Sequence, residues 1–167
     1  LLVITLDNTI LNVALPTLVD ELDATNSQLQ WIVDGYTLVF AGLLLTAGSL
    51  GDRLGRKGAL QIGLVIFGIG STLSAFATSP DHLIVTRCIM GIGGAFMMPQ
   101  SLTLVTVVFP PEKRGTALGL WGSVVALGAI MGPIIGGTIV THYAWEWVFL
   151  INLPGGIAAV LATLRIV

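Results

Sequence analysis

The sequence predicts an all-α membrane protein with six transmembrane helices. Of its 167 residues 54% are hydrophobic and only 10% are charged, whereas a soluble domain carries about 25% charged residues. Six apolar runs are each long enough to cross a bilayer, which takes roughly 20 residues at 1.5 Å rise per residue. Short connections between the runs favour antiparallel neighbours in one bundle.

The six expected helices follow one another without long loops. A helix of a soluble protein has a single apolar stripe, but the third run is nearly apolar all round, so buried helices of a large soluble core are disfavoured. The alternation of a membrane β-barrel is absent. The chain starts inside an apolar run without Met or a basic segment, so we expect a piece of a larger protein and not a signal peptide. The expected helices span about 1–19, 29–50, 59–78, 83–108, 116–141 and 148–166.

The charged residues between the runs predict an orientation. Cationic loops of membrane proteins lie in the cytoplasm, so the loops after the second and fourth helices are expected there, in a multi-pass protein of the cell (inner) membrane. A net charge of −2 argues against a nucleic-acid partner and leaves the lipid bilayer as the surroundings. The cations of these loops are Arg53, Arg56, Lys57, Lys113 and Arg114, and the opposite loops hold acidic residues and histidines but no Lys or Arg.

Three ionisable residues fall inside the apolar runs: Asp7, Asp34 and Arg87. Charged groups are costly at membrane depth and are functional candidates by default. Asp34 and Arg87 lie near the outer ends of their runs, so the alternative is an interfacial position, with Arg87 snorkelling to the surface. Asp7 is deeper, and its alternative is a structural ion pair or an interhelical hydrogen bond. If all three face one cavity, they form a cluster that exchanges protons and attracts a cationic ligand.

The sequence contains no set of residues that indicates an enzyme. No cluster has zinc-ligand spacing. The segment 91–94 is glycine-rich but lies within an apolar run and follows no strand, so it does not indicate a nucleotide site. We therefore expect no catalytic residues, no metal and no cofactor. The polar side chains of Asn8, Asn12, Gln61 and Gln100 are expected to join helices by hydrogen bonds.

The fifth run carries a dense glycine pattern around a proline: Gly128, Gly132, Pro133, Gly136 and Gly137. Glycines three or four residues apart share one helical face, and that face lets a neighbouring backbone approach closely. Pro133 removes a backbone hydrogen bond and favours a kink. Bent helices near the centre of a bundle are typical of alternating-access transporters.

The two halves of the chain show a weak internal symmetry. The first and fourth runs each carry an ionisable residue, Asp7 or Arg87, and a later proline, Pro16 or Pro99. Runs one to three and runs four to six have opposite orientations, which predicts a 3+3 inverted repeat.

A charged turn separates the second and third runs: Gly48-x-x-x-Asp52-x-x-Gly55-Arg56-Lys57. This spacing resembles the loop motif between the second and third helices of the major facilitator superfamily. Five further segments resemble motifs of its fourteen-helix drug:H⁺ antiporters, the EmrB/QacA type. They are residues 6–16, 31–36, 87–95, 128–137 and 145–154.

The resemblance implies that residues 1–167 are the N-terminal transmembrane half of a proton-coupled multidrug efflux transporter. A proton gradient would be the energy source, and the partners would be the missing C-terminal half and a small, lipophilic, cationic substrate. It implies proton coupling for Arg87, a gating role for the residue 48–57 loop with Asp52 bracing it, and an antiporter motif in residues 128–137. Glu146 departs from the family, which often has a basic residue there.

Other functions remain open from the sequence. Within the same fold, the chain could belong to a nutrient symporter or to an exporter of metabolites, siderophores or lipids. A membrane scaffold, a membrane enzyme or a channel could use similar helices, but no residue set supports them.

Overall fold

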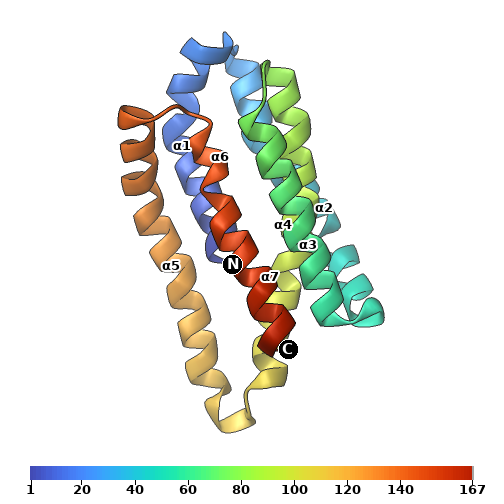
Figure 1. The fold of residues 1–167 in the computed structure, drawn as a ribbon. Coiled ribbons are helices and arrows are strands. Elements are labelled where there is room, and N and C mark those ends of the chain that lie inside the picture. Colours follow the sequence, from blue (N-terminus) through green and yellow to red (C-terminus); the bar gives the residue numbers. More distant parts are fainter. Residues whose placement is uncertain (167) are drawn as a thin grey trace.

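The computed structural model describes residues 1–166, which fold into a helical bundle (Figure 1). Five helices and the α6–α7 pair, Trp147–Arg165, are long and apolar enough to cross a membrane. No strand occurs among the described residues, so the prediction of an all-α fold with six spans is confirmed. The helices are α1 (Leu2–Leu22), α2 (Asn26–Leu54), α3 (Arg56–Ala75), α4 (Pro80–Val108), α5 (Pro111–His142), α6 (Trp147–Leu150) and α7 (Asn152–Ile166).

Helices α2, α3, α4 and α5 begin three to five residues before the expected apolar runs, and side-chain caps form the polar first turns of α2 and α4. Thr25 and Gln28 form a capping box, in which each residue's backbone N–H donates to the other's side chain, at 3.1 and 3.3 Å. The Ser79 hydroxyl accepts from the backbone N–H of His82 at 3.3 Å. Proline opens both α4 and α5, at a position that needs no N–H donor.

The sixth span was expected as one helix, and Trp147–Arg165 is one candidate membrane span. Its hydrogen bonding is interrupted at Ile151, between α6 and α7, although Ile151 keeps helical backbone angles (φ −62°, ψ −22°) and donates to the Trp147 carbonyl oxygen at 3.1 Å. Pro154 lies in the first turn of α7 and lacks the N–H that would bond to the carbonyl of Leu150, four residues earlier. The chain therefore has a joint between the two helices, and Asn152 is the first residue after it.

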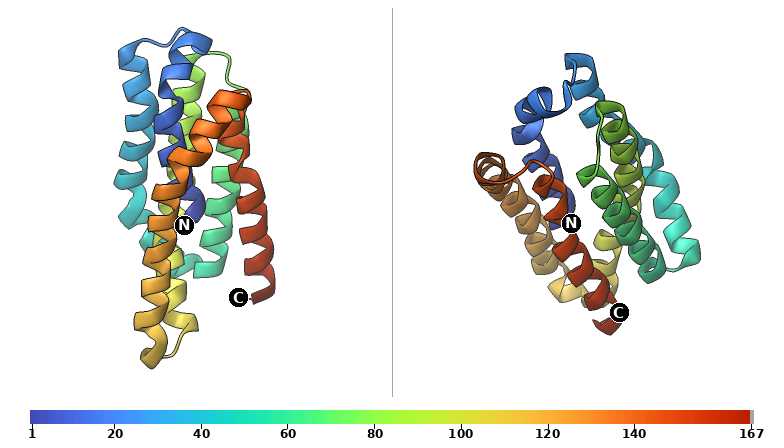
Figure 2. Two further views of the ribbon diagram at one scale, coloured as in Figure 1. Left: turned by 90° about the vertical axis from the view of Figure 1, so that its left-hand side faces the viewer. Right: turned by 45° about the horizontal axis from the view of Figure 1, so that its top comes forward.

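The helices pack in two groups. α1 lies along α5, while α4 lies between α2 and α3 and packs closely on both. The right-hand view of Figure 2 shows the α1–α5 pair on one side and the α2–α3–α4 group on the other. When spans one to three are matched with spans four to six, α1 corresponds to α4 and α2 corresponds to α5. The α1–α5 contact then corresponds to the α4–α2 contact. This contact follows the symmetry expected of an inverted repeat, whereas the close α3–α4 packing has no equal counterpart, because α6 and α7 touch α1 only lightly.

Glycines bring α4 into backbone contact with both neighbours. A Cβ on Gly93 would lie 2.6 Å from the Phe67 nitrogen and 2.7 Å from the Gly63 carbonyl oxygen in α3. A Cβ on Gly91 would lie 2.7 Å from the Tyr36 carbonyl oxygen in α2. The close approach places α4 at the centre of its group, so that Arg87 on this helix is buried.

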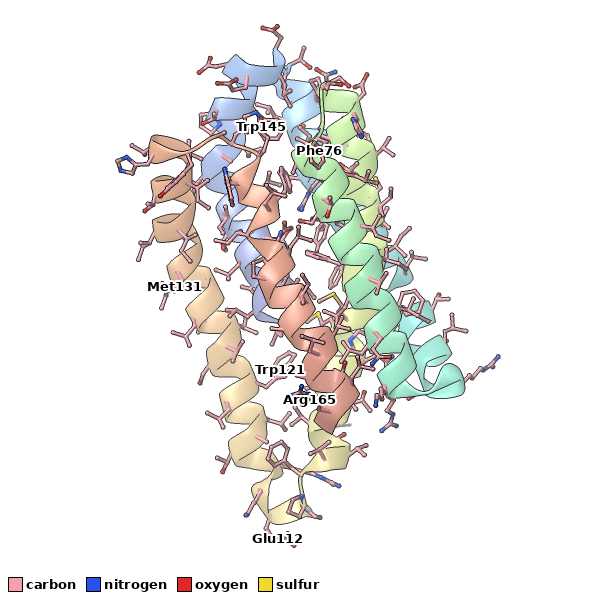
Figure 3. The ribbon with its side chains drawn as sticks, viewed as in Figure 1. Phe76, Glu112, Trp121, Met131, Trp145 and Arg165 are labelled. Atoms are coloured by element: carbon pink, nitrogen blue, oxygen red, sulfur yellow. The ribbon has the colours of Figure 1, made fainter. Side chains whose placement is uncertain are left out.

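The outer surface is apolar between two charged ends. Met131 on α5 and Phe76 at the end of α3 are exposed, and Figure 3 shows such side chains covering the outside of the helices. The loops after α2 and α4 and the end of α7 lie toward the same end of the bundle (Figure 1). An apolar belt of this kind suits the hydrocarbon core of a bilayer.

Candidate functional site

A buried ion pair joins α1 and α4 inside the bundle. Arg87 Nη1 donates to Asp7 Oδ2, and neither side chain has any exposed surface. The interfacial position considered for Arg87 is therefore wrong, because a snorkelling side chain would reach the surface. Burying two charges carries a large desolvation cost, which is offset only when the pair has good geometry and further hydrogen bonds.

Arg87 has further partners on two helices. Its Nη2 donates to Asn8 Oδ1 at 3.2 Å, and its Nε donates to the Ile32 carbonyl oxygen at 3.4 Å. The guanidinium carbon lies 4.3 Å from the ring centroid of Tyr36, in a cation–π contact. The guanidinium is thus held by α1 and α2, while its own helix, α4, fixes its depth in the bundle.

Asp7 is held from the other side by a hydrogen-bonded chain. Asn152 Nδ2 donates to Asp7 Oδ1 at 2.8 Å and lies 3.1 Å from Ser71 Oγ. The Ser71 hydroxyl donates to the Phe149 carbonyl oxygen at 2.7 Å. The ion pair is therefore the centre of a network that reaches α3, α6 and α7.

Sequence reasoning did not find the network partners Asn152 and Ser71. Single uncharged polar residues are common in transmembrane helices, and nothing in their spacing relates them to Asp7. The available signal for Asn152 was its place in the segment 145–154, which resembles a family motif. Asn8 was expected to join helices, and it does so by accepting from Arg87.

The Tyr36 hydroxyl is an unsatisfied group beside the ion pair. It is buried and has no hydrogen-bond partner among the described residues. Its ring stacks on Phe40 with centroids 5.9 Å apart, and a Cβ on Gly94 would lie 2.9 Å from the hydroxyl oxygen. A buried hydroxyl without a partner is unusual in a folded protein.

Asp34 does not join this cluster. It is half-buried on α2 and makes no hydrogen bond or ion pair within residues 1–166. Trp31 and Leu38, about one turn to either side, are 52% and 61% exposed. Asp34 thus lies at the border of a surface of α2 that the other five spans leave uncovered. The structure brings together two of the three candidate residues.

The segment 48–57, expected as a loop, is almost entirely helical: α2 continues to Leu54, α3 begins at Arg56, and only Gly55 lies between them. The last turns of α2 are fastened to α4. Gln100 Nε2 donates to the carbonyl oxygens of Ala47 and Gly48 at 3.4 and 3.5 Å, and a Cβ on Gly51 would collide with this amide. On the outside, Arg56 Nε lies 3.2 Å from Asp52 Oδ1. Asp52 on α2 thus pairs with Arg56 on α3 across Gly55. Lys57 follows in the first turn of α3.

Gly55 separates α2 from α3 in a backbone conformation that other residues rarely adopt, with φ +93° and ψ 127°. A Cβ there would meet no atom within 4 Å, so any cost of Gly55→Ala comes from the backbone. We expect Gly55→Ala to destabilise the protein by about 1–3 kcal/mol, measured by thermal unfolding in detergent. Gly58→Ala, in open space within α3, is the matched control and should be neutral or slightly stabilising. Equal effects of the two substitutions would contradict this reason.

Three glycines of the predicted motif in α5 form the contact with α1. A Cβ on Gly132 would lie 1.7 Å from Thr9 Oγ1, and one on Gly136 would lie 3.2 Å from the Ile10 Cα. The Thr9 hydroxyl is within 3.2 Å of the Gly128 carbonyl oxygen. This contact with α5 positions the part of α1 that carries Asp7. Gly137 faces open space, and α5 continues as one helix through the exposed Pro133.

Comparison with known proteins identifies the family. The model of the Major Facilitator Superfamily matches residues 1–167. The chain is 41% identical over 165 residues to the tetracenomycin C resistance and export protein of Streptomyces glaucescens, covering 99% of this chain and 31% of that protein. It is 38% identical over 161 residues to the riboflavin transporter RibZ of Clostridioides difficile, covering 96% and 35%.

A solved structure shows the same fold. A bacterial homologue of the human lysosomal transporter Spinster, in an inward-facing and unoccupied conformation, superposes with a TM-score of 0.78 at 20% identity, over 98% of this chain and 39% of that one. The chain spans about a third of the length of the curated relatives it matches. A match along its full length to the family model, together with these relatives, shows that this multi-pass membrane chain belongs to the Major Facilitator Superfamily of transporters and is not an enzyme.

Proposed function

We propose that the chain is the N-terminal half of a drug:H⁺ antiporter of the fourteen-helix type, which exports small lipophilic cations across the cell membrane. The observation that carries this proposal is the fully buried Asp7–Arg87 pair where α1 and α4 meet. Paired ionisable groups inside a membrane bundle mark ion pathways and proton relays. The relative whose name includes resistance and export supports the direction of transport.

The ion pair offers a simple basis for exchange. With Asp7 ionised, the pair has no net charge, and a cationic substrate can approach. When Asp7 takes a proton from water, Arg87 is left as an uncompensated positive charge, which repels a cation at short range in a medium of low dielectric constant. Proton and substrate then bind antagonistically, and this reciprocal coupling is what antiport requires.

Asp34 is proposed as a second acidic group of the transport path. It borders the uncovered surface of α2, and the remaining two thirds of a protein of the relatives' length would supply the helices that cover this surface. A carboxylate at such a boundary can attract a cationic substrate before the substrate reaches the ion pair.

The orientation follows from the cations. The cations lie in the last turn of α2 and in the first turns of α3 and α5, beside the α2–α3 and α4–α5 connections, and the positive-inside rule assigns that end to the cytoplasm. They are Arg53, Arg56, Lys57, Lys113 and Arg114. Gating by the segment 48–57 would then take place on the cytoplasmic side. Tagging each loop in the full-length protein for accessibility in intact cells tests this assignment.

The central test is efflux of a lipophilic cationic dye from vesicles that carry the full-length protein under an imposed pH gradient. Asp7→Asn should abolish gradient-driven efflux, because an amide cannot exchange the proton. Asp34→Asn should reduce it for cationic dyes only. Asp20→Asn, which alters an exposed carboxylate at the end of α1, is the control and should transport normally. If Asp7→Asn and Asp34→Asn both leave gradient-driven efflux intact, the mechanism is wrong.

A second candidate is a transporter of an uncharged substrate within the same family. The observation that favours it is the 38% identity over 161 residues to the riboflavin transporter RibZ of Clostridioides difficile. Competition assays separate the two, because a cation exporter is inhibited by lipophilic cations and not by uncharged planar compounds of the same size.

A further inference from the structure

We propose that Asn152 is a positioning residue that holds the Asp7 carboxylate for its pairing with Arg87 and links the charge of Asp7 to the α6–α7 joint. The proposal deepens the function proposed above and rests on it. Its geometric basis is the bond from Asn152 Nδ2 to Asp7 Oδ1, at 2.8 Å, on the oxygen that Arg87 does not use. Asn152 is only 4% exposed, so water has little access to replace this donor.

The assignment of the amide follows from its partners. An ionised carboxylate only accepts hydrogen bonds, so the amide nitrogen of Asn152 must face Asp7. The same nitrogen lies 3.1 Å from Ser71 Oγ, whose hydroxyl donates to the Phe149 carbonyl oxygen. One side chain thereby joins α1 to α3 and, through Ser71, to the end of α6.

The α6–α7 joint is a weak point that these bonds stabilise. Helix α6 has only four residues, the break falls at Ile151, and Pro154 cannot donate a backbone hydrogen bond across it. A joint of this kind is a natural hinge, because few backbone bonds must be broken to bend it. The hydrogen bonds of Asn152 and Ser71 connect this hinge directly to the buried charge.

Few titratable groups surround Asp7. Among the described residues, α4 contributes Arg87 and α2 contributes Tyr36, whose ring lies over Arg87. The nearest polar contributions from α3 and α7 are uncharged, Ser71 and Asn152, and α5 faces α1 with glycines. A change of charge at Asp7 is therefore felt mainly by Arg87 and Asn152.

Protonation of Asp7 alters both of its contacts. The carboxylate takes one proton from water, Arg87 keeps its own, and the net charge of the pair rises by one. A neutral carboxyl group accepts hydrogen bonds more weakly than a carboxylate, so the hydrogen bond from Asn152 weakens together with the ion pair. The α6–α7 joint then loses its link to α1, and the sixth span is released to move.

The test is a titration of Asp7 in the full-length protein by infrared difference spectroscopy, read from the carboxylic C=O band that Asp7→Asn removes. This readout does not depend on transport. Asn152→Ala should move the pH midpoint of the band, and of efflux, upward by about one to two units, since it removes a hydrogen bond that favours the charged carboxylate. Ser71→Ala should give a smaller shift in the same direction, because it removes only the support of Asn152.

Gln61→Ala is the matched control. It removes a different polar bond between the same two helices, from Gln61 Nε2 to Thr163 Oγ1 at 3.3 Å, and it should leave the midpoint unchanged. An unshifted midpoint in both Asn152→Ala and Ser71→Ala, or an equal shift in Gln61→Ala, would overturn the role of Asn152. Failure of the proposed antiport function would give a different result. Efflux by the wild type and by Asp7→Asn would respond identically to the pH gradient, while the infrared band of Asp7 would still titrate in the wild type.

Discussion

Arg87→Met is expected to destabilise the full-length protein by about 3–5 kcal/mol, because it leaves the buried Asp7 carboxylate without its cation. Methionine occupies a similar volume, so the effect reports the lost charge more than a cavity. The hydrogen bonds to Asn8 and to the Ile32 carbonyl oxygen are lost as well. Thermal and denaturant unfolding of the purified protein in detergent measure the change, and gradient-driven efflux should be lost.

The double variant Asp7→Leu/Arg87→Met separates stability from transport. Replacing both members of a buried ion pair by apolar residues is often neutral or stabilising, so most of the lost stability should return. Efflux should not return, because no proton-exchanging group remains in the buried part of α1. Recovery of transport in the double variant would contradict the functional role of the pair. An Arg87→Met variant as stable as wild type would contradict its structural role.

Gly132→Leu is expected to have the second large effect. A Cβ at this position would overlap the Thr9 side chain, 1.7 Å from its Oγ1 and 2.5 Å from its Cβ. The Thr9 Cβ is attached to the backbone and cannot turn away, so α1 and α5 must separate. Overpacking of this kind costs about 1–3 kcal/mol or more, and it displaces the helix that carries Asp7. Unfolding in detergent and efflux should both be impaired.

Two variants test the cause of this effect. Gly137→Leu introduces the same side chain on the open face of α5, where no atom lies within 4 Å, and should be tolerated. The pair Thr9→Gly/Gly132→Ala moves the small residue from α5 to α1 and should recover part of the stability lost in Gly132→Ala. Similar losses at Gly132 and Gly137 would contradict contact with α1 as the cause, because helix propensity favours leucine over glycine at both positions.

Much of the architecture was predictable because the membrane restricts the possibilities. Hydrocarbon excludes unpaired backbone groups, so long apolar runs must be helices, and all six expected spans are present. The first residues of α2, α4 and α5 were predicted three to five residues too late in the sequence. The caps at Thr25 and Ser79 and the prolines that open α4 and α5 extend these helices into polar sequence. The break at Ile151 has a signal in Pro154, which local reasoning overlooked.

The candidate site was predictable only in part. Asp7 and Arg87 stood out because ionisable residues are rare inside apolar runs. Their direct pairing, the supporting role of Asn152 and the separation of Asp34 depend on the rotation and depth of each helix. These are set by packing, such as the backbone contact of Gly93 with α3 and of Gly132 with α1, and no local pattern encodes them.

Hydropathy and charge along the chain were sufficient to establish a six-span membrane bundle, and the motifs to indicate its family, because both are local properties of the sequence. Which polar groups meet in the interior was decided by the three-dimensional packing alone. Asp7 and Asn152 lie on the first and last spans of the chain, yet they share a hydrogen bond of 2.8 Å. The physical reason is that interhelical contacts depend on how glycine surfaces allow helices to approach, and such contacts have no fixed spacing in the sequence.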